Sequence, residues 1–150
     1  MTADPVARAL TELEPATPAR RAAVFDGAGG WASALAPAGW ARVASAPVDL
    51  VVLSLLQEPG IPARRGEILA AAADRLVPTG HVLVIDHNRP RRWRARLPAT
   101  VSLWWRGLSA DRGTYPTARE IAANGFEVER LLLGRGERVQ VVVARRREVG

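Results

Sequence analysis

The residues of this sequence that could carry out chemistry follow short apolar runs. The first run ends at Asp26, and the next four residues are Gly27, Ala28, Gly29 and Gly30. Glycine allows the backbone to turn tightly and to approach a ligand closely. The segment therefore predicts either a plain turn after a strand or a loop that holds a cofactor, and both interpretations fit the residues alone.

Two further groups of candidate residues follow the next two apolar runs. Ser54 and Leu55 lie near the end of the run 48–56, and His87 directly follows the run 81–86. Ligands of parallel sheets bind at the edge where the carboxyl ends of the strands meet. We therefore predict that Ser54 and Leu55 line a pocket, with plain core packing as the alternative. His87, with an ordinary pKa of about 6.5, is either a general base or a surface residue.

A basic segment with interleaved tryptophans occupies residues 87–113. Arginine pairs with phosphate in a bidentate manner, and both arginine and tryptophan stack on flat rings. The segment therefore predicts contact with an anionic small molecule or a nucleic acid, and a solvated helix face is the alternative. The predicted substrate-binding residues are His87, Arg89, Arg91, Arg92 and Trp93.

The composition limits the class of protein. The 150 residues fit one domain, 1–150, and 48% of them are hydrophobic, which is enough for one core. The absence of cysteine excludes disulfides and thiolate metal ligands, and with two histidines we predict no metal site. All 21 basic residues are arginines and give a net charge of +6, which indicates either an anionic partner or solvated surface charge alone.

The sequence contains no run that approaches the roughly 20 apolar residues of a membrane span. The first ten residues, with Asp4 and Pro5, lack the layout of a signal peptide. We therefore expect a cytoplasmic protein with no membrane partner.

The pattern of apolar residues predicts an alternation of strands and helices. Residues 2–13 fit a helix capped by Thr2 or Asp4, and the runs 48–56 and 81–86 fit buried strands. Between those two strands the pattern predicts a helix and then a turn, at 64–76 and 78–80. A strand–helix–strand unit is typical of a parallel sheet with a right-handed crossover.

The C-terminal third predicts a helix followed by a hairpin. Thr117 and Glu120 have the spacing of a capping box, and the helix they open ends at 124–125. The strands predicted at 126–133 and 138–144 should pair antiparallel at the end of the sheet. The predicted fold class is α/β, with a mostly parallel Rossmann-like sheet, helices on both faces and an antiparallel C-terminal hairpin.

The order of these elements resembles the C-terminal half of class I S-adenosylmethionine (SAM)-dependent methyltransferases. The segments that carry the resemblance are 48–54, 73–86 and 124–128, the last with the sequence Asn-Gly-Phe-Glu-Val. The resemblance implies methyl transfer from SAM to an unidentified substrate. The implied cofactor-binding residues are Asp26, Gly27, Gly29, Gly30, Ser54 and Leu55.

The first half of the chain departs from that family, because Asp26 lies only 23 positions before Asp49. The family normally places two more strands in this interval. In one register Asp26 ends the family's first strand and the glycines form the cofactor loop. In the other register Asp26 ends the third strand, and the glycine-rich loop and the acid that binds the ribose are absent.

The short first half leaves a second function open. The chain could be a catalytically inactive methyltransferase-like binding module, or a fragment, that acts through its arginine and tryptophan surface. Its partner would then be an anionic molecule or a catalytic subunit. An incomplete parallel sheet has an exposed edge, which also favours a homodimer.

Overall fold

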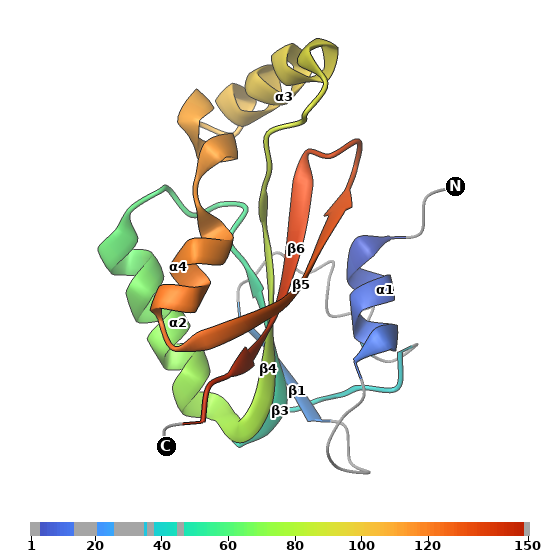
Figure 1. Cartoon of the computed structure of the whole chain (residues 1–150), viewed down its shortest axis with the longest axis vertical. Coiled ribbons are helices and arrows are strands. Elements are labelled where there is room, and N and C mark those ends of the chain that lie inside the picture. The colour runs from blue at the N-terminus through green and yellow to red at the C-terminus, as the bar shows by residue number, and fades with distance from the viewer. Residues whose placement is uncertain (1–3, 14–20, 26–34, 36–37, 45–46, 149–150) are drawn as a thin grey trace.

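The computed structural model describes residues 4–13, 21–25, 35, 38–44 and 47–148 (Figure 1). These residues form one mixed sheet with strand order β2-β1-β3-β4-β6-β5. The elements in chain order are α1 (Pro5–Glu12), β1 (Arg21–Phe25), β2 (Ala41–Arg42), β3 (Val48–Ser54), α2 (Pro62–Arg75), β4 (Leu76–His87), α3 (Trp93–Trp105), the 3-10 helix η2 (Ala110–Thr114), α4 (Thr117–Ala123), β5 (Phe126–Gly134) and β6 (Val139–Arg146).

The sheet combines parallel and antiparallel pairing. Strand β1 pairs parallel with both β2 and β3, and β3 pairs parallel with β4. Strand β6 lies between β4 and β5 and is antiparallel to both, which is the predicted C-terminal hairpin. The expectation of a mostly parallel sheet is not confirmed, because the two antiparallel pairings have the longest registers. The parallel side is short, since β2 contributes only two residues.

Helices cover both faces of the sheet (Figure 1). Val6 of α1 belongs to one hydrophobic cluster with Leu83 of β4. Leu69 of α2 and Ile121 of α4 belong to a second cluster, which includes Val82 of β4. Successive side chains of a strand point to opposite faces, so one buried strand supplies both clusters. This double burial explains why β3 and β4 are almost continuously apolar.

The turn predicted at 78–80 is wrong, because β4 continues through these residues. The irregularity is instead a bulge, at which Val48 pairs with Leu76 but Leu50 pairs with His81. Gly80 fits the bulge because a side chain there would lie 2.9 Å from the Leu76 Cδ2 atom. The sequence thus correctly indicates an irregularity at these residues, but the irregularity is a bulge within β4 and does not end the strand.

Helix α1 begins as its sequence predicts. The backbone amide of Val6 donates to the Asp4 carboxylate at 3.0 Å, and Pro5 occupies the first turn. The Pro5 ring lies against Gly134 at the end of β5, and a side chain at Gly134 would approach the Pro5 Cδ atom to 2.8 Å. Gly134 therefore allows α1 to lie directly on the hairpin.

Replacing Gly134 by alanine is expected to lower the free energy of unfolding by about 1–3 kcal/mol, the usual cost of overpacking. Urea denaturation measures the change. The matched control is Gly66→Ala in α2, where the new carbon would meet only the Asn124 Oδ1 atom at 3.5 Å. That control should stabilise the protein by roughly 0.5–1 kcal/mol, because glycine disfavours a helix interior. Equal effects at the two glycines would contradict the α1 contact.

Candidate functional site

Three parallel strands bring their carboxyl ends to one edge of the sheet. Phe25 of β1 pairs with Leu53 of β3, and Ser54 pairs with Ile85 of β4. Strand β1 is an inner strand, with β2 on its other side. Strand β1 therefore ends beside Ser54. An inner position for β1 is what the first of the two registers requires.

The predicted cofactor-binding residues divide into two groups. The residues Asp26, Gly27, Gly29 and Gly30 lie outside the described residues. Ser54 is buried at the end of β3, and its Oγ atom has no hydrogen-bond partner in the described part of the chain. Leu55 belongs to the hydrophobic cluster under α2.

Asp86, at the end of β4, is the centre of a buried polar cluster that the sequence analysis did not predict. Its side chain is inaccessible to solvent. One carboxylate oxygen accepts hydrogen bonds from Arg112 Nη2 at 2.6 Å and from the His87 amide at 2.7 Å. The other accepts from Arg65 Nη2 and Thr117 Oγ1, both at 2.7 Å. Four donors thus compensate the loss of hydration of one carboxylate.

Arg65 extends the cluster from α2 to α4. Its Nε atom lies 2.9 Å from Glu120 Oε2, and its guanidinium stacks on the Tyr115 ring at 4.1 Å from the centroid. Burial disfavours the charged guanidinium, but the attraction of Asp86 and Glu120 outweighs it and raises the pKa of Arg65. Tyr115 donates to Glu120 Oε1 at 2.8 Å. Arg65 therefore remains charged and fully enclosed.

The capping box predicted for α4 is wrong, although the helix is present. The helix has no side-chain capping bond, and its N-cap residue is Pro116. Thr117 donates to Asp86, and Glu120 binds Arg65. The two side chains that could have closed a capping box are thus used by the buried cluster.

Arg112 joins the cluster to the loop that follows β3. Its Nη2 atom donates to the carbonyl of Leu55 at 3.0 Å, and its Nε atom donates to the carbonyl of Glu58 at 2.8 Å. The His87 ring lies 2.8 Å from the carbonyl of Leu56. Three carbonyls of residues 55–58 are thus held by side chains from other elements. This loop forms part of the edge at which a ligand would bind.

His87 is buried, with 8% of its surface exposed. Burial lowers the pKa of His87 below its ordinary value, against the opposing effects of the Leu56 carbonyl and Asp86. The ring is therefore neutral at pH 7. A neutral ring that contacts a carbonyl through Nε2 carries its proton on Nε2, which leaves Nδ1 as an acceptor.

The buried His87 should make the protein less stable in mild acid. Its pKa is lower in the folded chain than the unfolded value of about 6.5, so the unfolded chain takes up the proton first. We expect the free energy of unfolding to be unaffected by this group above about pH 7 and to fall as the pH drops below about 6.5. Subtracting the pH profile of the His87→Gln variant isolates the effect. If the free energies of unfolding of the parent and the variant changed in parallel between pH 7.5 and 5.5, this prediction would be wrong.

The predicted substrate-binding arginines do not converge on one point. Arg89, Arg91 and Arg92 are exposed, and the side chain of Arg94 lies over the Trp93 ring at 5.4 Å. A hollow of about 190 Å³ lies beside Arg89, between α3 and η2. Its polar lining residues are Asn88, Arg89, Arg96, Thr100, Asp111 and Thr114. Of the predicted substrate-binding residues, Arg89 alone lines this hollow.

The ends of the α3 segment meet at this hollow. A side chain at Gly113 would lie 3.7 Å from the backbone of Arg89, so the chain passes closely beside its own start. The two ends of the segment 90–112, which contains α3, therefore lie next to each other.

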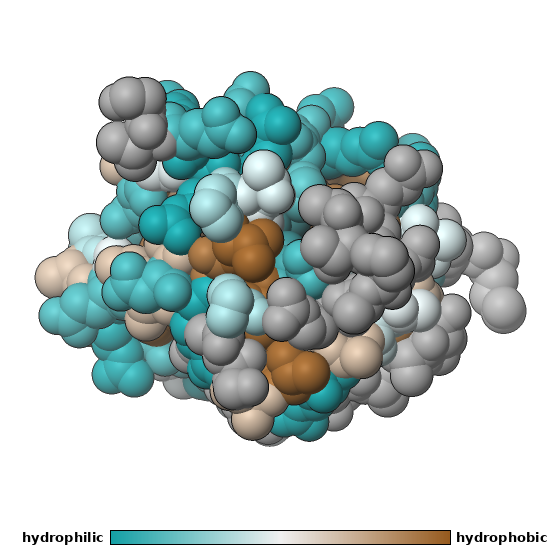
Figure 2. All heavy atoms as spheres, turned by 90° about the horizontal axis from the view of Figure 1, so that it is seen from below, coloured by the Kyte–Doolittle hydropathy of each residue, from teal (hydrophilic) through white to brown (hydrophobic). Residues whose placement is uncertain are grey.

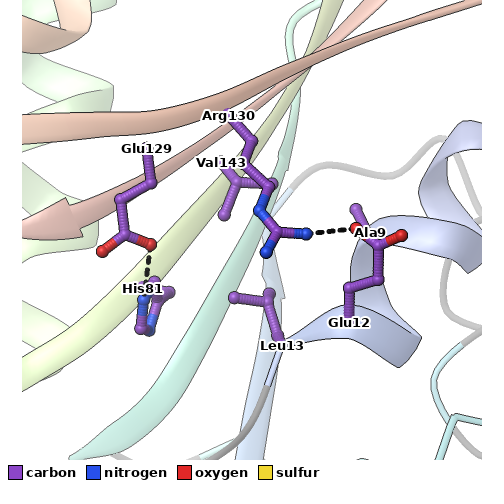
Figure 3. Close-up of a pocket in the computed structure, with 7 residues that line it drawn as sticks. All are labelled: Ala9, Glu12, Leu13, His81, Glu129, Arg130 and Val143. Carbon is purple, nitrogen blue, oxygen red and sulfur yellow. Dashed lines mark hydrogen bonds and ion pairs between the residues drawn. The ribbon is translucent and has the colours of Figure 1, made fainter.

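A second hollow of about 130 Å³ lies between the end of α1 and the strands (Figure 3). His81 lies 3.1 Å from Glu129, and Arg130 pairs with Glu12. These polar side chains thus already have partners. His81 lies at the other end of the paired part of β4 from the carboxyl edge.

One sequence signal could have identified Arg65 as buried. Arg65, Leu69 and Ala72 are the buried residues of α2, and their spacing of four and three residues defines one helical face. Arg65 thus continues an apolar stripe. Arg112 has no such signal, because it lies in the short 3-10 helix η2 between Asp111 and Gly113.

The sequence itself matches no family model, and no curated protein sequence matches it. Solved structures do match the fold. The pyocyanin biosynthetic protein PhzM superposes with a TM-score of 0.70 at 18% identity, over 95% of this chain and 54% of that chain. The mitomycin 7-O-methyltransferase MmcR gives 0.69 at 18% identity, over 95% and 53%.

Human N-acetylserotonin methyltransferase, solved in complex with SAM, gives a TM-score of 0.57 at 14% identity, over 85% of this chain and 47% of that chain. The chain therefore has the fold of SAM-dependent methyltransferases, and it spans about half the length of the solved chains that it matches. None of the helices in the described ranges is both long and apolar enough to cross a bilayer.

Proposed function

We propose that this chain is a methyltransferase domain that binds SAM at the carboxyl edge of β1 and β3 and transfers the methyl group to a small molecule. The observation that carries the proposal is the inner position of β1, which ends at the same edge of the sheet as Ser54 of β3. The likeness to O-methyltransferases supports an oxygen atom as the acceptor.

The described residues fit such a cofactor at one point. The Ser54 Oγ atom is buried and has no hydrogen-bond partner in the described part of the chain, so it is available to a polar ligand atom. Asp26, Gly27, Gly29 and Gly30 would surround the ligand from β1, and Leu55 would support the floor of the pocket. Asp26 would bind polar groups of the cofactor, and the glycines would let the backbone approach it.

When bound, SAM would supply an electrophilic methyl group on a sulfonium sulfur. The acceptor hydroxyl would take this methyl group and give up its proton, and S-adenosylhomocysteine would be the leaving group. The protein contributes mainly proximity and alignment. His87 is our candidate for the proton acceptor, because its ring is neutral and Nδ1 is the nitrogen left to accept.

The hollow beside Arg89 is our candidate for the substrate site. It lies just beyond the end of β4, and its charged lining residues are two arginines, Arg89 and Arg96, and one acid, Asp111. These features support a small anionic or polar substrate. Arg91, Arg92 and Trp93 would act only at the rim, because all three are exposed.

Calorimetric titration of the full chain with SAM and with S-adenosylhomocysteine tests the proposal. We expect a dissociation constant in the micromolar range, about −8 kcal/mol. Asp26→Ala should weaken binding at least tenfold, and Glu127→Ala, an exposed acid on β5, should leave it unchanged. If millimolar cofactor does not bind to the folded chain, the proposal is wrong and a catalytically inactive binding module becomes the better hypothesis.

A further inference from the structure

Helix α3 exposes an unusually large apolar surface. Trp93 and Leu97 are each 73% exposed, and Trp105 is 87% exposed. Val101 and Trp104 complete the surface, at 38% and 66%. We refer to Trp93, Leu97, Val101, Trp104 and Trp105 as the α3 outer face.

Four of these side chains lie on one side of the helix, and Trp105 directly follows the last of them. Residues 93, 97, 101 and 104 follow each other at spacings of four, four and three, which places them along one stripe. The opposite side, with Leu103, is buried against the domain. A helix that is apolar on both sides is normally covered on both sides. The α3 outer face therefore indicates a partner.

The charge around this face identifies the chemistry of the partner. Residues 87–110 contain six arginines and no acidic residue. Three acids border this stretch: Asp86 is buried, Asp111 lines the hollow beside Arg89, and Glu137 accepts from the Arg91 amide at 2.9 Å. Two copies of such a face would bring like charges together, which opposes a homodimer through α3. A surface rich in negative charge would be attracted to it.

The position of α3 suits a flat partner. The helix lies across the end of the molecule at which the carboxyl ends of β3 and β4 meet (Figure 1). Among the described residues, the surface at the opposite end of the molecule is mainly hydrophilic, with small hydrophobic areas (Figure 2). A helix at an extremity can lie along a plane without interference from the rest of the fold.

We propose that the α3 outer face docks on the surface of an anionic phospholipid bilayer. The three tryptophans and Leu97 would enter the boundary between headgroups and acyl chains, where aromatic rings are favoured. Arg91, Arg92 and the other arginines would extend toward the lipid phosphates. The sequence-based expectation of no membrane partner considered only spanning segments, and a helix that lies on the surface needs none.

A nucleic acid fits this face less well. Its phosphates would attract the same arginines, but bases stack on aromatic rings and gain little from Leu97 or Val101. These two side chains are 73% and 38% exposed and lie between Trp93 and Trp104. A continuous apolar stripe is instead what insertion into a lipid interface requires.

Co-sedimentation of the full chain with large vesicles tests the proposal. Vesicles of phosphatidylcholine with 30% phosphatidylglycerol should bind the protein at least tenfold more strongly than vesicles of phosphatidylcholine alone, and the tryptophan emission should shift to shorter wavelength. The double variant Trp104→Ser, Trp105→Ser should lose at least tenfold of this binding. Its matched control is Leu131→Ser, Leu133→Ser on β5, two other exposed apolar residues, which should bind like the parent.

Three outcomes would overturn the proposal. The first is an absence of binding to the anionic vesicles. The second is equal loss of binding in the α3 variant and in its control. The third is a concentration-dependent dimer, seen by sedimentation velocity, that the α3 variant abolishes. Neither this test nor its outcomes depend on SAM, so failure here leaves the proposed enzymatic function untouched.

Discussion

Replacing Asp86 by asparagine is expected to lower the free energy of unfolding by about 3–5 kcal/mol, the usual cost of breaking a buried ion pair from one side. The variant keeps the shape of the side chain but removes its charge. Arg65 and Arg112 would then be buried beside a neutral amide. The NH₂ group of the asparagine would also replace one carboxylate oxygen. Because this group is itself a donor, it would face the donors that the oxygen had accepted from.

Urea denaturation at pH 7 measures this loss. Glu127→Gln is the matched control, because it makes the same chemical change in an ion pair with Arg145 that is about half exposed on both sides. Exposed pairs contribute little, so the control should remain within about 1 kcal/mol of the parent. A similarly small effect for Asp86→Asn would mean that the buried cluster does not stabilise the fold.

Replacing Arg112 by methionine is expected to lower the free energy of unfolding by about 3 kcal/mol or more, because it removes two buried hydrogen bonds and one partly buried one at once. The carbonyls of Leu55 and Glu58 would lose their donor, and Asp86 would lose one of its two guanidinium partners. Arg112→Lys should recover only part of the loss. A lysine is a point charge that cannot reproduce the fork of a guanidinium.

A double-mutant cycle with Asp86→Asn separates the two roles of Arg112. The coupling energy between the two sites should be at least 1 kcal/mol, since the side chains are in direct contact. The remaining part of the Arg112 effect reports the carbonyls of the 55–58 loop. Arg119→Met, an exposed arginine on α4, is the control and should be nearly neutral. Purely additive effects of Asp86→Asn and Arg112→Met would contradict the proposed contact.

The order of the elements could be predicted from the sequence because each rests on a local pattern. Continuous apolar residues mark β3 and β4, and the stripe with Leu69 and Ala72 marks α2. The hairpin of β5 and β6 follows from the turn residues between them. In all these cases the same side chains decide both the local conformation and the burial.

The polar cluster could not be predicted in the same way, because its members are brought together from distant parts of the chain. The spacing of Thr117 and Glu120 fits a local capping box, yet both residues bind partners from other elements. Tertiary contacts with a buried carboxylate and a buried guanidinium are therefore more favourable than the local hydrogen bonds of a capping box. Arginine is also rarely fully buried, so nothing in the composition around Arg112 indicated its position.

The closed base of the α3 segment has a consequence for how the chain can vary. Because Gly113 lies against Arg89, the residues between them form a loop whose two ends already meet. The entropy of closing a flexible loop grows only with the logarithm of its length, so doubling it costs about 0.6 kcal/mol. Insertions or substitutions between Arg89 and Arg112 that keep Arg112 itself would leave the register of β4 and β6 unaltered. The surface residues of α3 can thus change while the sheet that supports the helix remains folded.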